Sequence, residues 1–159
     1  MKSLTIEVLD DGRRVIVSGS IDEFCDLEAL AQVLASGESS IEVDLGQVHR
    51  INSVGVSKWI RAVRSASPNR SVRWVNVSAV MASQLTMIAN FGASATVESF
   101  FAPYYCEACD AEHDVLLRTE SLTSDGKAPP QACSTCQSHM VFDDVAEGYF
   151  DSLRNLANP

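Results

Sequence analysis

The sequence lacks any long apolar run. No stretch approaches the ~20 apolar residues that a membrane-spanning helix needs. The N-terminal residues MKSLTIEVLDDGRR also lack the apolar centre of a secretory signal. We therefore expect a cytoplasmic protein with no segment inserted directly into a membrane.

Lys and Arg are scarce in the last third of the chain. Residues 101–159 contain three Lys or Arg and ten Asp or Glu, a net charge of −7. Residues 1–100 contain nine Lys or Arg and eleven Asp or Glu, a net charge of −2. Residues 101–159 therefore supply most of the total net charge of −9. Proteins that bind a phosphate backbone need clustered Lys and Arg. We therefore expect no nucleic-acid partner.

The motifs that carry catalysis are also missing. The chain has no glycine-rich phosphate loop, no clustered carboxylate pair and no nucleophile in a recognisable motif with His. It has no internal repeat and no low-complexity tract. Its 159 residues, 46% of them hydrophobic, suffice for one domain with a buried core and a small annex. We therefore expect a globular protein that is not an enzyme.

The first hundred residues alternate between strand and helix patterns. Period-two patterns predict strands over 4–9, 13–18, 41–46, 72–77 and 96–101. Apolar residues at helical spacing predict helices over 22–35, 53–66 and 78–90. Strands that alternate with short helices favour an α/β fold, with a mixed sheet covered by helices mainly on one face.

The pattern changes near Pro103, where paired cysteines replace the alternation of strands and helices. We therefore expect two units, residues 1–102 and a C-terminal annex at 103–159. Within the annex, strands and a final helix are predicted over 114–119, 140–142 and 143–156. That helix would have two Asp in its first turn and one apolar face. The sequence leaves open whether this face packs on the first unit or on another subunit.

Four of the five cysteines form two CxxC pairs. Cys106 and Cys109 are separated from Cys133 and Cys136 by 23 residues. Two such turns supply the four thiolates of a tetrahedral site, whereas a redox motif needs only one pair. Five cysteines without an export signal also favour a metal over disulfides. We predict a zinc-ribbon-like annex with a closed, structural Zn²⁺ site, iron being the less favoured metal.

The remaining cysteine and the three histidines are expected to have no functional role. A site closed by four cysteines does not need His113 or His139, so both are expected to be bystanders. Cys25 is expected to be a small, partly buried residue. His49 is expected to be exposed in a loop.

The segment from Ile41 to Arg64 predicts a buried strand, a short polar loop and a helix start. Asn52 and Ser53 precede the helical pattern, and Ser53 is expected to cap the helix by accepting hydrogen bonds from unpaired N–H groups. Its hydroxyl would lie at a helix N-terminus near the surface. N–H groups and the helix dipole favour a phosphate at such a place.

These residues resemble the central motif of STAS domains, the fold of bacterial anti-sigma factor antagonists. The family pattern is a hydrophobic strand, then D-L-x-x-V-x-x-I/M-D-S-S/T-G, then a helix. This chain has Asp44-Leu45, Val48 and Ile51-Asn52-Ser53-Val54-Gly55. Upstream, the segment VIVSGSID at residues 15–22 resembles the strand and G-x-L-D stretch that lead into the family's first helix. The resemblance covers roughly residues 4–100 and implies a STAS-like mixed sheet.

The resemblance also implies a role in protein interaction. In antagonist STAS domains the Ser at the position of Ser53 is phosphorylated by a partner Ser kinase, often the anti-sigma factor, and the phosphate blocks the interface. Here Asn52 stands in place of the family's Asp, and Val54 in place of Ser or Thr. The family's partner-binding surface corresponds to Arg50, Asn52, Ser53, Val54, Lys58, Arg61 and Arg64.

Three functions follow as hypotheses. The first is a signalling module of transcription regulation, switched by phosphorylation of Ser53. The second is a STAS adaptor subunit of a membrane lipid-transport complex, or a constitutive scaffold, which the altered residues Asn52 and Val54 fit. The third is a zinc ribbon that binds nucleic acid, which the negative charge of the annex disfavours.

Overall fold

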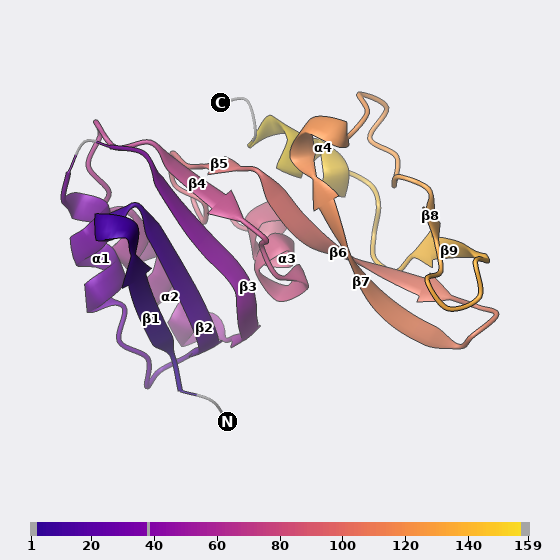
Figure 1. The fold of residues 1–159 in the computed structure, drawn as a ribbon, viewed down its shortest axis with the longest axis horizontal. Coiled ribbons are helices and arrows are strands. Elements are labelled where there is room, and N and C mark those ends of the chain that lie inside the picture. The colour runs from indigo at the N-terminus through magenta and orange to yellow at the C-terminus, as the bar shows by residue number, and fades with distance from the viewer. Residues whose placement is uncertain (1–2, 38, 157–159) are drawn as a thin grey trace.

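A computed structural model describes residues 3–37 and 39–156, and within them lie two β-sheets and four α-helices (Figure 1). This confirms the expected mixed α/β architecture. The first sheet contains, in spatial order, β1 (Thr5–Leu9), β2 (Arg14–Ile21), β3 (Ile41–Ile51), β4 (Val72–Val75) and β5 (Thr96–Val97). β1 runs antiparallel to β2, and the other neighbouring strands are parallel.

Helices follow three strands of this sheet. They are α1 (Glu28–Ala35), α2 (Ser53–Val63) and α3 (Ala79–Met87). α1 and α2 lie behind the sheet in Figure 1 and bury their apolar sides against it. The core centres on Trp59 and Trp74, whose ring centroids are 5.4 Å apart. Both indole N–H groups are satisfied, by the carbonyls of Phe91 and Gly92, so two large aromatic side chains are buried without an unpaired donor.

The second sheet is antiparallel and contains the cysteine pairs. Its strands, in spatial order, are β7 (Ala111–Arg118), β6 (Ser99–Cys106), β9 (His139–Phe142) and β8 (Gln131–Ala132). The last helix, α4 (Tyr149–Asn155), packs against α3 and places the ring of Phe150 near those of Phe100 and Phe142. The apolar face of the final helix therefore packs within the chain.

β6 joins the two sheets. Val77, just beyond β4, pairs with Phe100, and its N–H and C=O bond to Ser99 and Phe101 at 3.0 and 2.7 Å. β6 then continues through Pro103, whose carbonyl accepts a bond from the N–H of Asp143 at 2.9 Å. The division of the chain at 102/103 stays a prediction, and the residue that suggested it lies inside a strand.

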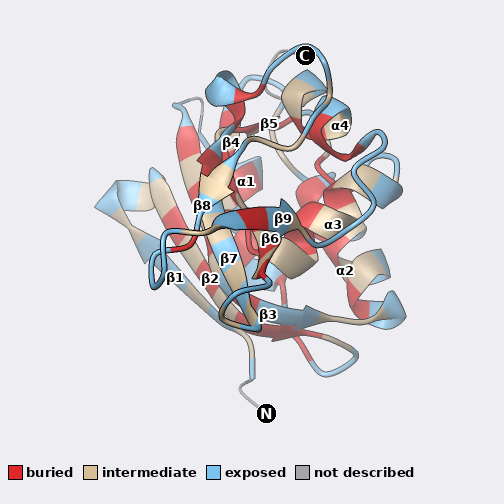
Figure 2. Ribbon diagram, turned by 90° about the vertical axis from the view of Figure 1, so that its right-hand side faces the viewer, coloured by how far each residue is buried: buried red, intermediate tan, exposed pale blue. Residues whose placement is uncertain are grey.

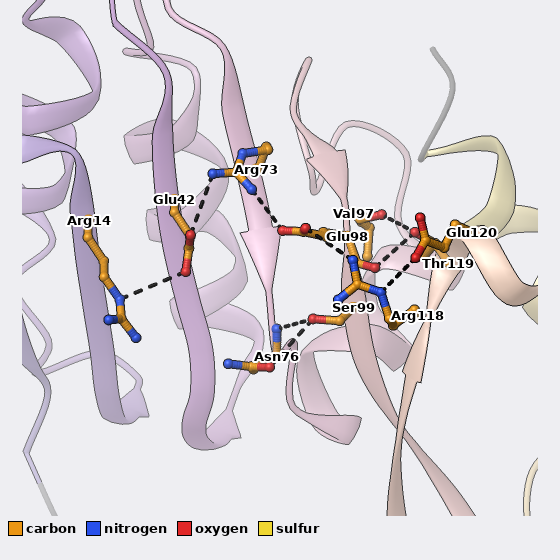
Figure 3. Close-up of polar contacts among 10 residues, drawn as sticks. All are labelled: Arg14, Glu42, Arg73, Asn76, Val97, Glu98, Ser99, Arg118, Thr119 and Glu120. Atoms are coloured by element: carbon orange, nitrogen blue, oxygen red, sulfur yellow. Dashed lines mark hydrogen bonds and ion pairs between the residues drawn. The ribbon is translucent and has the colours of Figure 1, made fainter.

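A row of alternating charges crosses the sheet face opposite the helices (Figure 3). The row consists of Arg14, Glu42, Arg73, Glu98, Arg118 and Glu120. Its tightest contact is between Arg73 and Glu98, at 2.8 Å. Each exposed pair contributes only about 0.2–1 kcal/mol, but together they link β2 to β7 and favour one register across both sheets.

The boundaries predicted near residues 22 and 46 were wrong, and the single strand predicted over 96–101 is divided between β5 and β6, which belong to different sheets. The polar loop predicted after residue 46 is part of β3, because residues 47–51 pair with the end of β2 through two register shifts. Backbone pairing therefore outweighed polar composition there. The helix predicted from residue 22 begins only at Glu28, because Asp22 and Asp26 bond the N–H groups two residues ahead and hold turns.

The final helix is also shorter than predicted. Gly148 adopts a left-handed φ of 76° and stands just before α4, so Asp143 and Asp144 precede the helix. The first turn contains Asp151 instead of the two expected Asp.

Candidate functional site

The thiols of the two cysteine pairs come together in space. The sulfur atoms of Cys106, Cys109, Cys133 and Cys136 all lie within 4.8 Å of one another. The Cys106–Cys136 and Cys109–Cys133 distances are 3.5 and 4.0 Å. A tetrahedral metal with bonds of about 2.3 Å to sulfur separates its ligands by about 3.8 Å. The cluster therefore has the donors and the spacing to hold a metal ion, and no other such group occurs among the described residues.

Strand ends and tight turns position these thiols. Cys106 ends β6, and Cys109 lies in the turn before β7. Cys133 follows β8 and makes two backbone bonds across its turn, to Ser138 and Gln137. The N–H of Thr135 points to the Cys133 sulfur at 3.4 Å. Cys106 and Cys133 are buried, Cys109 is partly buried and Cys136 is exposed, so the cluster reaches the protein surface.

The thiols differ in how readily they lose a proton. The hydroxyl and backbone of Ser138 lower the pKa of Cys136 to about 6. The contact with Cys136, followed by burial, raises the pKa of Cys109 to about 12. Because metals bind thiolates, all four thiols would have to lose their protons to hold one ion.

One histidine lies against the cluster. The Nε2 atom of His113, on β7, is 3.7 Å from the Cys133 sulfur. His139 is exposed at the start of β9. The four sulfur donors form a complete group without either ring.

The second candidate site is the start of α2. Asn52 is the N-cap, because its Oδ1 accepts a bond from the N–H of Gly55 at 2.9 Å. Ser53 is therefore the first residue of the helix, and the expectation that it caps the helix was wrong. Its side chain is exposed, and Val54 beside it is 47% exposed. A hydroxyl and an apolar side chain are thus both available on this surface.

A close backbone contact fixes this helix start. A Cβ atom on Gly55 would overlap the carbonyl oxygen of Ile21, at the end of β2. The same carbonyl accepts a bond from the N–H of Asn52 at 3.2 Å. Glycine is required because it lets α2 begin directly against the backbone of β2.

The loop between β2 and α1 supplies a carboxylate that sequence reasoning missed. Glu23 accepts a bond from the Asn52 side chain at 2.6 Å. Backbone bonding, then Asn52, lowers the pKa of Glu23. Lys58 donates to the carbonyls of Glu23 and Cys25 at 2.6 and 2.9 Å. A negative charge therefore stands near Ser53, although the neighbouring Asn52 carries none. The contact joins residues 29 positions apart, so the local sequence did not indicate it.

The remaining residues of the expected partner surface are distributed around this point. Arg50 is exposed near the end of β3, and Arg61 and Arg64 are exposed on and just after α2. Lys58 and Arg61 border a cleft of about 370 Å³ between α1 and α2, which also includes buried Cys25. His49 is exposed as expected, but within β3 instead of a loop.

Comparison with protein-family models, curated proteins and solved structures found no match for this chain. The class that the fold and the site define is a mixed α/β protein with a four-cysteine cluster that could bind a metal. Among the described residues, no helix is both long and apolar enough to cross a bilayer.

Proposed function

We propose that this chain is a non-enzymatic protein-interaction module, similar in function to an anti-sigma factor antagonist, with a structural Zn²⁺ in its annex. The observation that carries the proposal is the start of α2. Ser53 and Val54 are exposed there, on a backbone held by the Asn52 cap and the Gly55 contact. A surface that is both exposed and fixed suits recognition by a partner protein.

Phosphorylation of Ser53 would change this surface strongly. A phosphate adds about −1.5 to −2 charges, and the dipole at a helix N-terminus stabilises it. The neighbouring Glu23 already carries a negative charge, because its pKa is lowered. The added charge would therefore make the start of α2 more acidic, and would weaken the binding of a partner that fits the unmodified surface.

The chemistry of the cluster favours zinc as its metal. Four thiolates at tetrahedral spacing suit Zn²⁺ or iron. With all four positions filled by protein, the ion has no open place for substrate, so its role is structural. The annex is too small to bury a large core of its own, and metal binding would supply much of its folding free energy.

A constitutive adaptor, such as a subunit of a lipid-transport complex, is the second candidate. Its supporting observation is apolar exposure beside Ser53. Phe24 is 85% exposed, and Val54 lies at the start of the helix that this loop contacts. A permanent interface buries such side chains, and it needs no phosphate.

Affinity capture from the native cells tests the first candidate, with mass spectrometry of the captured proteins and of the chain itself. The baits are the wild type, Ser53→Ala, Ser53→Glu and the control Ser65→Glu, which adds the same charge beyond the far end of α2. We expect a Ser kinase to co-purify with every bait except Ser53→Glu, and phosphate to be found on Ser53.

The same partners with all four baits, and no phosphate on Ser53, would contradict the switch. If a transporter ATPase were then among them and were lost with Phe24→Ser, the adaptor function would replace the first candidate.

A further inference from the structure

One face of the second sheet, here called the outer face, is not covered by α3 or α4. Side chains alternate along β6, so Phe101, Pro103 and Tyr105 lie on this face and the buried Phe100 and Tyr104 on the other. α4 packs on the buried side, where the rings of Tyr149 and Phe150 contact Phe100. The outer face is therefore the solvent side of this sheet.

Apolar side chains are exposed on this outer face. Leu116 lies opposite Phe101 and is 48% exposed. Val141 lies opposite Tyr105 and is 49% exposed. Along β9, Met140 is buried between the exposed His139 and Val141, and Figure 2 shows β9 with a buried stretch between exposed ones. The two strands that pair with β6, β7 and β9, thus each present a large apolar side chain to solvent. These side chains lie next to the apolar side chains of β6 on the same face.

The outer face ends in a cleft. Phe101 and Asp114 border an open cleft of about 360 Å³, which is also lined by residues of β3 and of the start of α3. Val48 and Val80 are among its lining residues. The cleft is large enough for one bulky apolar side chain and has a carboxylate at its border.

The charges of residues 101–117 have one sign. Residues 101–117 contain four Asp or Glu and no Lys or Arg. Glu112 and Asp114 lie in register with Tyr105 and Pro103. The hydroxyl of Tyr105 donates to Asp110, and this bond raises the pKa of Tyr105. The basic residue that follows the segment, Arg118, is already bound by Glu98 and Glu120.

We propose that this outer face docks a Lys- and Arg-rich segment of a protein partner that also carries a large apolar side chain. An apolar centre with a charged border is the usual composition of a protein interface. Charge complementarity selects a basic partner and accelerates its association, whereas a nucleic acid is repelled. This surface is separate from the start of α2 and does not depend on Ser53.

The test is an amide NMR titration of the metal-loaded full chain with a short synthetic peptide in which Lys alternates with Leu around a central Trp. We expect saturable shifts in β6, β7 and β9, and weaker binding at higher salt. Glu112→Gln with Asp114→Asn should weaken binding roughly three- to tenfold. Leu116→Ser should weaken it while leaving distant amides unchanged.

The matched control is Glu7→Gln with Glu28→Gln, which removes two exposed charges from the first unit. Equal weakening in this control would overturn the proposal, because total charge would then explain the binding. The proposal also fails if the shifts lie elsewhere, if the peptide does not saturate, or if its Lys-to-Glu counterpart binds equally. Shifts of the same amides with protein concentration alone would make a second copy the occupant and overturn it as well.

Discussion

At the scale of single residues, Gly55 has the most demanding position. A methyl group there meets the backbone of Ile21, which cannot move without disturbing β2. We expect Gly55→Ala to lower the free energy of unfolding by about 1–3 kcal/mol, the usual cost of overpacking. Urea unfolding measures this, with Ser57→Ala on the same helix as the control. A change equal to that of the control would show that α2 begins without the close contact.

The buried hydroxyl of Tyr104 leads to a prediction about how stability depends on pH. Its hydroxyl donates to the carbonyl of Pro129 at 2.7 Å, and burial raises its pKa to about 12. A raised pKa favours the neutral form in the folded state, so its stabilisation is present below the unfolded pKa of about 10 and is lost as pH rises through about 12. Burial also raises the pKa of Tyr149, so a spectrophotometric titration should show more than one tyrosine that ionises late, and Tyr104→Phe should reduce their number by one. An unchanged number of late-ionising tyrosines in this variant would contradict the assignment to Tyr104.

Residue identity predicted some of these roles and not others. The spacing of Cys106, Cys109, Cys133 and Cys136 predicted their convergence, because two CxxC turns have one common use. Glu23 carried no local signal, since its partner Asn52 comes from another part of the chain. Long-range contacts between polar residues leave no periodic pattern, and this is why sequence reasoning missed it.

At the scale of elements, most strands and helices were predictable, but their boundaries and the division of residues 96–106 into β5 and β6 were not. Apolar periodicity revealed the strand at residues 41–45 and the helix from residue 53. It could not show that residues 47–51 would extend β3, because that extension depends on pairing with β2. Likewise, nothing in the pattern of residues 143–148 showed that the chain would turn at Gly148 before forming a helix.

α4 offers a test of how the annex is attached. Phe150 is buried and packs near Phe100 and Phe142, which belong to β6 and β9. We expect Phe150→Ala to destabilise the chain by about 3–5 kcal/mol, through lost burial and a residual cavity. Thermal or urea unfolding gives the value, and the exposed Val145→Ala serves as the control. A loss of under about 0.5 kcal/mol, within the range of surface changes, would mean that α4 is not part of the core.

At the scale of the whole molecule, β6 determines how far the unfolding caused by metal removal can extend, because this strand contacts both sheets. Its first half is bonded to Val77 and its last residue is Cys106. The strand therefore joins the core of the first sheet to the four-cysteine cluster. Unfolding that begins at the cysteine turns therefore affects the first sheet only if the whole of β6 loses its pairing.

We expect one Zn²⁺ per chain, and its removal by a chelator should unfold the cysteine turns and leave the first sheet folded. Hydrogen exchange should become fast at residues 106–110 and 131–142, while β2 and β3 keep their protection. Cys133→Ser should reproduce the loss of metal, and Cys25→Ser, which changes the one cysteine outside the cluster, should bind metal normally. Full metal content in Cys133→Ser would contradict the four-cysteine site. Loss of protection in β2 and β3 would show that the metal stabilises both sheets, with β6 as the connection between them.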